Sequence, residues 1–283
     1  MDFIQAYLTG LRSTFQQQKL WLLLYALNFL FAMFLAFPLS SYLDDKLGNT
    51  LAIDKLKEGF DYTVFYDFMK DYGDIAGFIL DQSLVGLGLY LILSIFLIGG
   101  ILKIFIEKPK HSSLSAFWDG ASSYFWRMLR LTVYFIIIHF LLLVLFFTIF
   151  SFLTAGGLER FRNESEIIQR GLVLTPIYLF FATVVFMIQD YAKINLVSTN
   201  SRYLFQPIWQ SVRWISKNFT QSFLLYILNF LTFGILFAIY WQVEPNNALF
   251  LAFIISQLFI LSRIGTKLLN LASATQLYQS RQE

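Results

Sequence analysis

The chain has 283 residues, of which 57% are hydrophobic, 19% are aromatic and only 14% are charged. A water-soluble protein carries about a quarter charged residues, so this composition excludes an ordinary soluble fold and predicts an all-α protein in a lipid membrane. The absence of cysteine excludes disulfides, thiolate metal sites, thiol nucleophiles and iron–sulfur clusters. The net charge of +3 is too small and too dispersed to indicate nucleic-acid binding.

Six long apolar segments follow one another along the chain. Each is close to the ~20 residues needed to cross a hydrocarbon core of ~30 Å, so we expect six transmembrane helices in a single membrane domain over residues 1–283. The expected spans are Leu20 to Leu39, Leu84 to Leu102, Leu131 to Leu153, Leu172 to Lys193, Phe223 to Val243 and Ala248 to Ile264.

The polar segments beside these spans alternate in charge. Both ends of the chain and the second and fourth connections hold 14 of the 21 basic residues, counting Lys193 and Arg263 with the segments that follow them. The other three connections hold 13 of the 18 acidic residues. By the positive-inside rule, both termini and the two basic connections are predicted to be cytoplasmic.

The first outer connection, residues 40–83, carries nine acidic residues against four lysines. Apolar residues between Phe60 and Met69 recur at helical spacing, which predicts a short amphipathic helix on the outer membrane surface. Asp67, Asp71 and Asp74 lack the ligand spacing and the turn glycine of a calcium loop. No metal site is therefore expected here.

Amphipathic stretches precede the three odd-numbered spans, over residues 3–15, 114–125 and 205–219. We predict that each is an interfacial helix on the cytoplasmic side. Laying Ile4–Leu30 over Phe205–Leu231 without a gap gives nine identities in 27 positions. The chain is thus predicted to be a threefold pseudo-repeat of helical hairpins, with units 1–106, 107–200 and 201–283.

Asp190 is the one carboxylate inside a predicted span, where an ionisable group costs roughly 2.5–3.5 kcal/mol on insertion scales. Lys193 follows one turn later and can pair with it, and Arg213 of the next segment is within reach. Two interpretations stay open. The pair either holds the third interfacial helix to the bundle, or it is a substrate or proton site.

Three further candidates are found among the polar residues inside predicted spans. Asn28 and Asn229 occupy equivalent positions in the overlaid segments, and His139 lies in the third span. Interhelical hydrogen bonds are the ordinary interpretation of such residues. Contact with a ligand, or a proton relay through His139, is the alternative.

The sequence lacks the common catalytic signatures. It contains no HExxH, GxSxG or Walker A motif, and no GxGxxG precedes a helix. Its two histidines are too few for a histidine-rich metal site. We therefore expect no catalytic residues, no cofactor and no metal, and the protein is predicted not to be an enzyme.

Several segments together resemble those of a known group of proteins: Gly99-Gly100-Ile101-Leu102, Phe117-Trp118-Asp119-Gly120, Tyr124-Phe125-Trp126-Arg127, and Asp190-Tyr191-Ala192-Lys193 with Asn218 downstream. The group is the uncharacterised six-span bacterial inner-membrane proteins, which are similar to the membrane domain of some glycerophosphodiester phosphodiesterases. The resemblance implies the fold and a multi-pass location in the bacterial inner (plasma) membrane. Because this sequence carries no hydrolase domain, it implies no phosphodiesterase activity.

These observations favour a non-enzymatic scaffold or assembly component of the bacterial envelope. Its expected partners are the lipid bilayer and, as a further candidate, another envelope protein. The alternative is a small permease or lipid transporter that uses Asp190.

Overall fold

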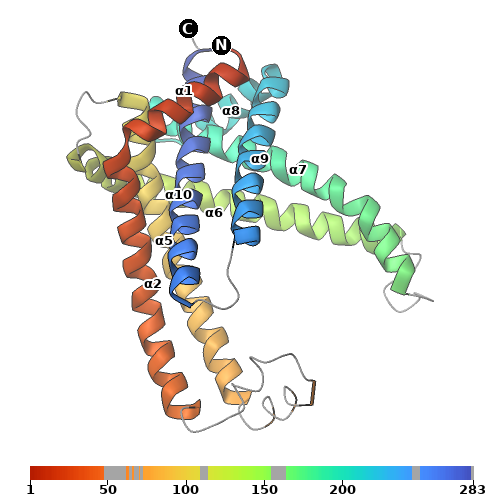
Figure 1. The fold of residues 1–283 in the computed structure, drawn as a ribbon. Coiled ribbons are helices and arrows are strands. Elements are labelled where there is room, and N and C mark those ends of the chain that lie inside the picture. Colours follow the sequence, from red (N-terminus) through yellow and green to blue (C-terminus); the bar gives the residue numbers. More distant parts are fainter. Residues whose placement is uncertain are drawn as a thin grey trace. The chain divides into compact units, whose positions relative to one another are not determined.

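The computed structural model describes residues 1–47, 62–63, 66, 70, 73–108, 114–153, 164–243 and 249–281. In these residues all the regular structure is helical, which confirms the all-α prediction (Figure 1). The helices are α1 Phe3–Gln16, α2 Gln18–Leu47, α5 Gly73–Glu107, α6 Leu114–Leu153, α7 Glu164–Ser198, α8 Phe205–Lys217, α9 Phe219–Val243 and α10 Leu249–Gln279.

Six helices of the described chain, α2, α5, α6, α7, α9 and α10, are long and apolar enough to cross a membrane. Five of them contain the whole of one predicted span, α10 begins at Leu249, one residue after the predicted start of the sixth, and most extend well beyond the prediction. The largest difference is in α10, which continues past the predicted end at Ile264 as far as Gln279. Its last part is more polar but contains no proline, so the backbone hydrogen bonding continues where the hydropathy falls.

Two of the three predicted interfacial segments are separate helices, and the third is not. The helical backbone is interrupted at Gln17 between α1 and α2, and at Asn218 between α8 and α9. The segment 114–125 is instead the first part of the uninterrupted helix α6. The amphipathic helix expected between Phe60 and Met69 lies largely outside the described residues.

The chain divides into two compact units. Unit 1 comprises Met1–Trp21 and Ile95–Glu283, and unit 2 comprises Leu22–Ser94. Within unit 2, the ring centroids of Phe31 and Tyr90 lie 5.7 Å apart, and those of Tyr42 and Phe78 lie 3.9 Å apart. These aromatic contacts join the part of α2 in this unit to the part of α5.

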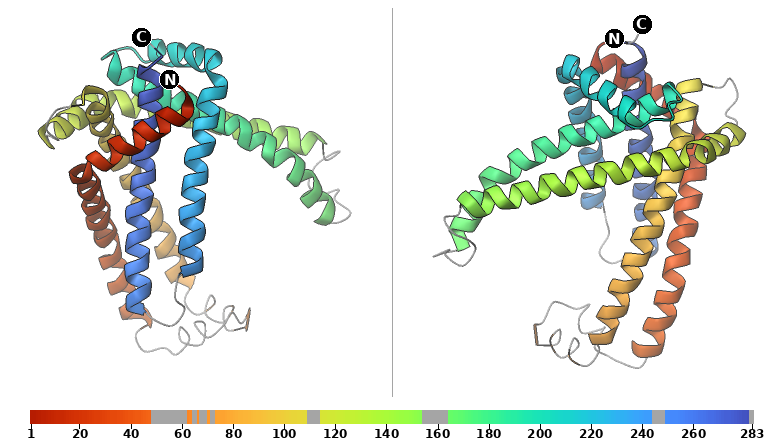
Figure 2. Two further views of the ribbon diagram at one scale, coloured as in Figure 1. Left: turned by 45° about the horizontal axis from the view of Figure 1, so that its top comes forward. Right: turned by 180° about the vertical axis from the view of Figure 1, so that it is seen from behind.

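Within unit 1, α1 crosses α10, and α6 and α7 lie side by side (Figure 2). The buried face of α1 consists of Ala6, Gly10 and Thr14. A Cβ atom added to Gly10 would lie 2.7 Å from the backbone of Ser273, so the two helices touch through their backbones. The two ends of the chain also meet, because the Arg281 guanidinium donates to the Met1 carbonyl at 3.2 and 3.3 Å.

The end of α5 packs on the start of α6 through glycines. A Cβ atom at Gly100 would lie 2.5 Å from the carbonyl oxygen of Phe117, and one at Gly99 would lie 2.9 Å from that of Gly120. Small residues allow this close approach of helices. The contact is between backbones, so a rotamer change cannot relieve an added methyl group.

Gly100→Ala is therefore expected to destabilise the protein by about 1–3 kcal/mol, since α5 and α6 must separate to admit the methyl group. The measurement is thermal unfolding of the detergent-purified protein. Gly234→Ala on α9 is the matched control, because a Cβ there meets open space. It should leave the melting temperature unchanged or raise it. Equal melting temperatures for the two variants would contradict the backbone contact.

Candidate functional site

The Asp190 carboxylate of α7 binds groups from three helices. Its Oδ1 accepts from the Lys193 ammonium at 3.0 Å. Its Oδ2 accepts from the Tyr226 hydroxyl of α9 at 2.7 Å and from the Asn270 amide of α10 at 3.4 Å. The side chains of Asp190 and Lys193 are only 18% and 10% exposed. The charge that the sequence singled out is thus largely buried and ties α7 to α9 and α10.

Asn229 extends this polar cluster along α9 and α10. Its amide nitrogen donates to Asn270 Oδ1 and to Ser273 Oγ, each at 3.2 Å. Its amide oxygen is buried and has no hydrogen-bond partner among the described residues. Because Ser273 is also the point where Gly10 of α1 touches α10, the network from Lys193 reaches the site where α1 crosses.

Three aromatic rings join α7, α8 and α10 next to this cluster. Tyr191 is fully buried, and its ring centroid lies 4.5 Å from that of Trp214. The ring centroids of Trp214 and Tyr278 lie 5.3 Å apart. Aromatic pairs in this distance range contribute about 0.5–1.5 kcal/mol beyond the area they bury. Helix α8 is therefore fixed to the helices that carry the polar cluster.

The structure brings together three of the six candidate polar residues: Asp190, Lys193 and Asn229. Arg213 lies exposed on α8, and the cation that pairs with Asp190 is Lys193. Asn28 belongs to unit 2 and donates to the Leu24 carbonyl of its own helix at 2.7 Å.

His139 lies on α6, the helix that precedes α7 in the sequence. Its Nδ1 is 2.8 Å from the Phe135 carbonyl, and its ring centroid is 4.2 Å from that of Phe186 on α7. Its Nε2 is buried without a partner in the described chain. The histidine thus packs between α6 and α7.

Sequence reasoning missed three members of the cluster: Tyr226, Asn270 and Ser273. Tyr226 was within reach, because it matches Tyr25 in the overlay that pairs Asn28 with Asn229. Asn270 and Ser273 follow Ile264, where the hydropathy of the sixth span ends, so no span-based search would include them. Their role becomes visible only once α10 is seen to continue.

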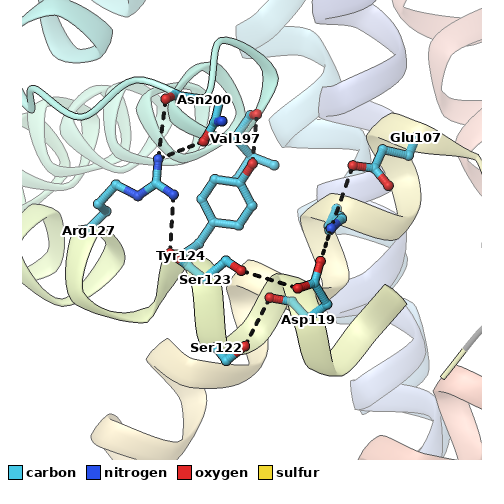
Figure 3. Close-up of polar contacts among 9 residues, drawn as sticks. Glu107, Asp119, Ser122, Ser123, Tyr124, Arg127, Val197 and Asn200 are labelled. Atoms are coloured by element: carbon cyan, nitrogen blue, oxygen red, sulfur yellow. Dashed lines mark hydrogen bonds and ion pairs between the residues drawn. The ribbon is translucent and has the colours of Figure 1, made fainter. Parts of the chain in front are cut away.

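A second group of polar contacts joins α5, α6 and the end of α7 (Figure 3). Asp119 of α6, 61% exposed, forms a hydrogen-bonded ion pair with Lys103 of α5, whose ammonium also lies 3.9 Å from Glu107. Arg127 of α6 reaches the chain just after α7. It donates to Asn200 Oδ1 at 2.8 Å, and to the carbonyls of Asn200 and Ser201 at 3.3 and 3.2 Å.

These contacts place Arg127 at the carboxyl end of a helix, where unpaired carbonyls and the helix dipole favour a cation. Asn200 has a φ of 48°, the left-handed conformation in which asparagine is common after helices. Arg127 therefore fixes the end of α7.

Among the residues that the structure describes, no three histidine, aspartate or glutamate side chains are grouped as metal ligands. The six apolar helices of the described chain define a multi-pass integral membrane protein. No protein family's sequence profile matches the chain, and comparisons with curated proteins and with solved structures found no match. Its function must therefore be argued from the cluster itself.

Arg127→Leu is expected to lower the free energy of unfolding by about 1–2 kcal/mol, since it removes charge-assisted hydrogen bonds to the end of α7. Thermal unfolding in detergent measures the change. Arg130→Leu is the matched control, because Arg130 is exposed and, among the described residues, bonds only to the Trp126 carbonyl of its own helix. A control that melts as early as Arg127→Leu would show that lost charge, and not the α7 contact, is responsible.

Proposed function

We propose that this protein is a non-enzymatic scaffold or assembly component of a bacterial inner membrane. The observation that carries the proposal is the bonding of Asp190, whose two oxygens are both occupied by partners from the chain itself. A carboxylate that holds helices together needs such partners. A carboxylate that receives a substrate or a proton has to exchange them.

The proposed orientation places both termini in the cytoplasm and α1 and α8 in the inner interface. The positive-inside distribution of charge supports it. Each of these helices buries one face and exposes large apolar residues elsewhere, including Ile4 and Leu8 on α1, and Phe205 and Trp209 on α8. Such side chains are suited to the boundary between headgroups and acyl chains.

The pairs α1–α2 and α8–α9 have the features of two copies of one unit. The sequence overlay pairs residues whose numbers differ by a constant amount. The same difference separates the helix break at Gln17 from the helix break at Asn218. It also pairs the buried residues of α1 with those of α8: Ala6 with Pro207, Gly10 with Ser211, and Thr14 with Ile215. A duplicated unit of a short helix followed by a spanning helix favours a rigid framework, although parallel repeats also occur in transporters.

A second candidate function is a small permease or lipid transporter that uses Asp190. One observation favours it: the Asn229 amide oxygen in the same cluster is buried and unpartnered among the described residues. A transported polar group could donate to that oxygen while Asp190 releases Tyr226 or Asn270. An enzyme acting on lipid has no such support.

Asp190→Asn tests the two candidates against each other. Under the scaffold proposal it leaves Lys193 without its counter-charge, which should cost about 1–3 kcal/mol and reduce the amount of protein in the membrane. The measurements are the membrane level by immunoblot and the melting temperature in detergent. Asp119→Asn is the matched control, because the Asp119 carboxylate is 61% exposed and pairs open to solvent contribute about 0–1 kcal/mol.

A normal level and melting temperature for Asp190→Asn would contradict the scaffold proposal, and loss of solute or lipid movement in proteoliposomes would then favour the transporter. Gentle-detergent purification of the native protein provides the positive evidence. A protein partner recovered at constant stoichiometry would support an assembly role and count against a stand-alone carrier.

A further inference from the structure

Helix α10 carries two basic residues on one face that the described structure leaves without counter-ions. Arg263 and Lys267 are one turn apart, so their side chains point the same way. Both are exposed, and neither forms an ion pair with a described residue. Gly265, on the other side of the helix, is covered by the Trp21 ring. The basic face is therefore distinct from the packed face.

This basic face adjoins the Asp190 cluster. Lys267 precedes Asn270, a ligand of Asp190, by one turn, and it lies within electrostatic range of both Lys193 and Asp190. Arg263 also lies within electrostatic range of Lys267. Lys193 and Lys267 thus lie near a single carboxylate, with Arg263 beside Lys267, and that carboxylate is already bonded to Lys193. The local balance is two positive charges in excess.

The depth of these residues follows from α1, which the proposed orientation places at the inner membrane surface. α1 crosses α10 at Ser273. With a rise of about 1.5 Å per residue, Lys267 and Arg263 lie about 9 Å and about 15 Å from that point, toward the apolar half of α10. Such residues extend their charges toward lipid headgroups, where phosphate is the available anion.

We propose that Arg263 and Lys267, with Lys193 beside them, form a binding site for the phosphate of an anionic membrane phospholipid. A guanidinium binds phosphate through two parallel hydrogen bonds, and an ammonium adds a point charge. Basic sites between helices on the cytoplasmic side of a membrane bind anionic headgroups in this way. The lipid neutralises the excess charge beside Asp190 and leaves the Asp190–Lys193 pair in place. The proposal rests on the orientation proposed above.

The test uses the full chain purified in a neutral detergent, with dioleoyl phosphatidylglycerol as the probe. The lipid is expected to raise the melting temperature by several degrees, with one bound molecule per chain in native mass spectrometry. The double variant Arg263→Gln/Lys267→Gln should weaken apparent lipid binding about tenfold or more, because each charged hydrogen bond is worth about a factor of ten.

The matched control is Arg213→Gln/Lys217→Gln, which removes another exposed basic pair one turn apart, on α8. It should keep the bound lipid. Equal loss in this control would overturn the site, as would equal stabilisation by dioleoyl phosphatidylcholine. Full stabilisation by inorganic phosphate alone would contradict the assignment to a lipid and would assign the site to a free anion.

If the double variant does not accumulate, the single variants Lys267→Gln and Lys267→Arg decide, since only the second keeps the charge. Lipid retained by both would overturn the role of Lys267. Bound lipid is measured on the isolated chain, so its absence leaves the scaffold proposal standing. Failure to find a protein partner likewise leaves the lipid site standing.

Discussion

The arrangement of α7, α9 and α10 depends on the hydrogen bonds that one buried carboxylate accepts inside an apolar bundle. Apolar helices in lipid gain little by burying apolar surface against one another, so their register is fixed by close packing and by polar bonds. Asp190 receives one such bond from each of α9 and α10 and an ion pair from its own helix. Sliding α9 or α10 by a turn would remove the hydrogen bond that its Tyr226 or Asn270 donates to the carboxylate, in a medium that cannot replace it.

Other contacts hold the same helices by different means. Gly10 brings α1 into backbone contact with α10 at Ser273, which belongs to the polar cluster. The rings of Tyr191, Trp214 and Tyr278 join α8 to α7 and α10. Directional polar bonds set the register, whereas the glycine and aromatic contacts set how closely the helices approach. Both kinds of contact meet along the last turns of α10.

Whether a residue of the cluster could be predicted from the sequence depends on the kind of signal that the residue carries. Asp190 and Lys193 were predictable, because a carboxylate in an apolar span needs a partner and the next turn supplies a lysine. Asn229 followed from the internal overlay. Asn270 and Ser273 were not predictable, because hydropathy reports where a helix leaves lipid and not where its hydrogen bonding stops. The uninterrupted α6 differs from the expected separate segment 114–125 for the same reason.

The position of the cluster on α10 links stability to the membrane surface. Its polar residues and the adjoining Arg263 and Lys267 occupy successive turns, so the helix becomes more polar gradually rather than at a single boundary. A gradual transition allows buried bonds to hold the bundle and nearby cations to face phosphate. Because Lys267 precedes Asn270, which donates to Asp190, by one turn, an anion bound at the basic face would lie beside the cluster that joins α7, α9 and α10.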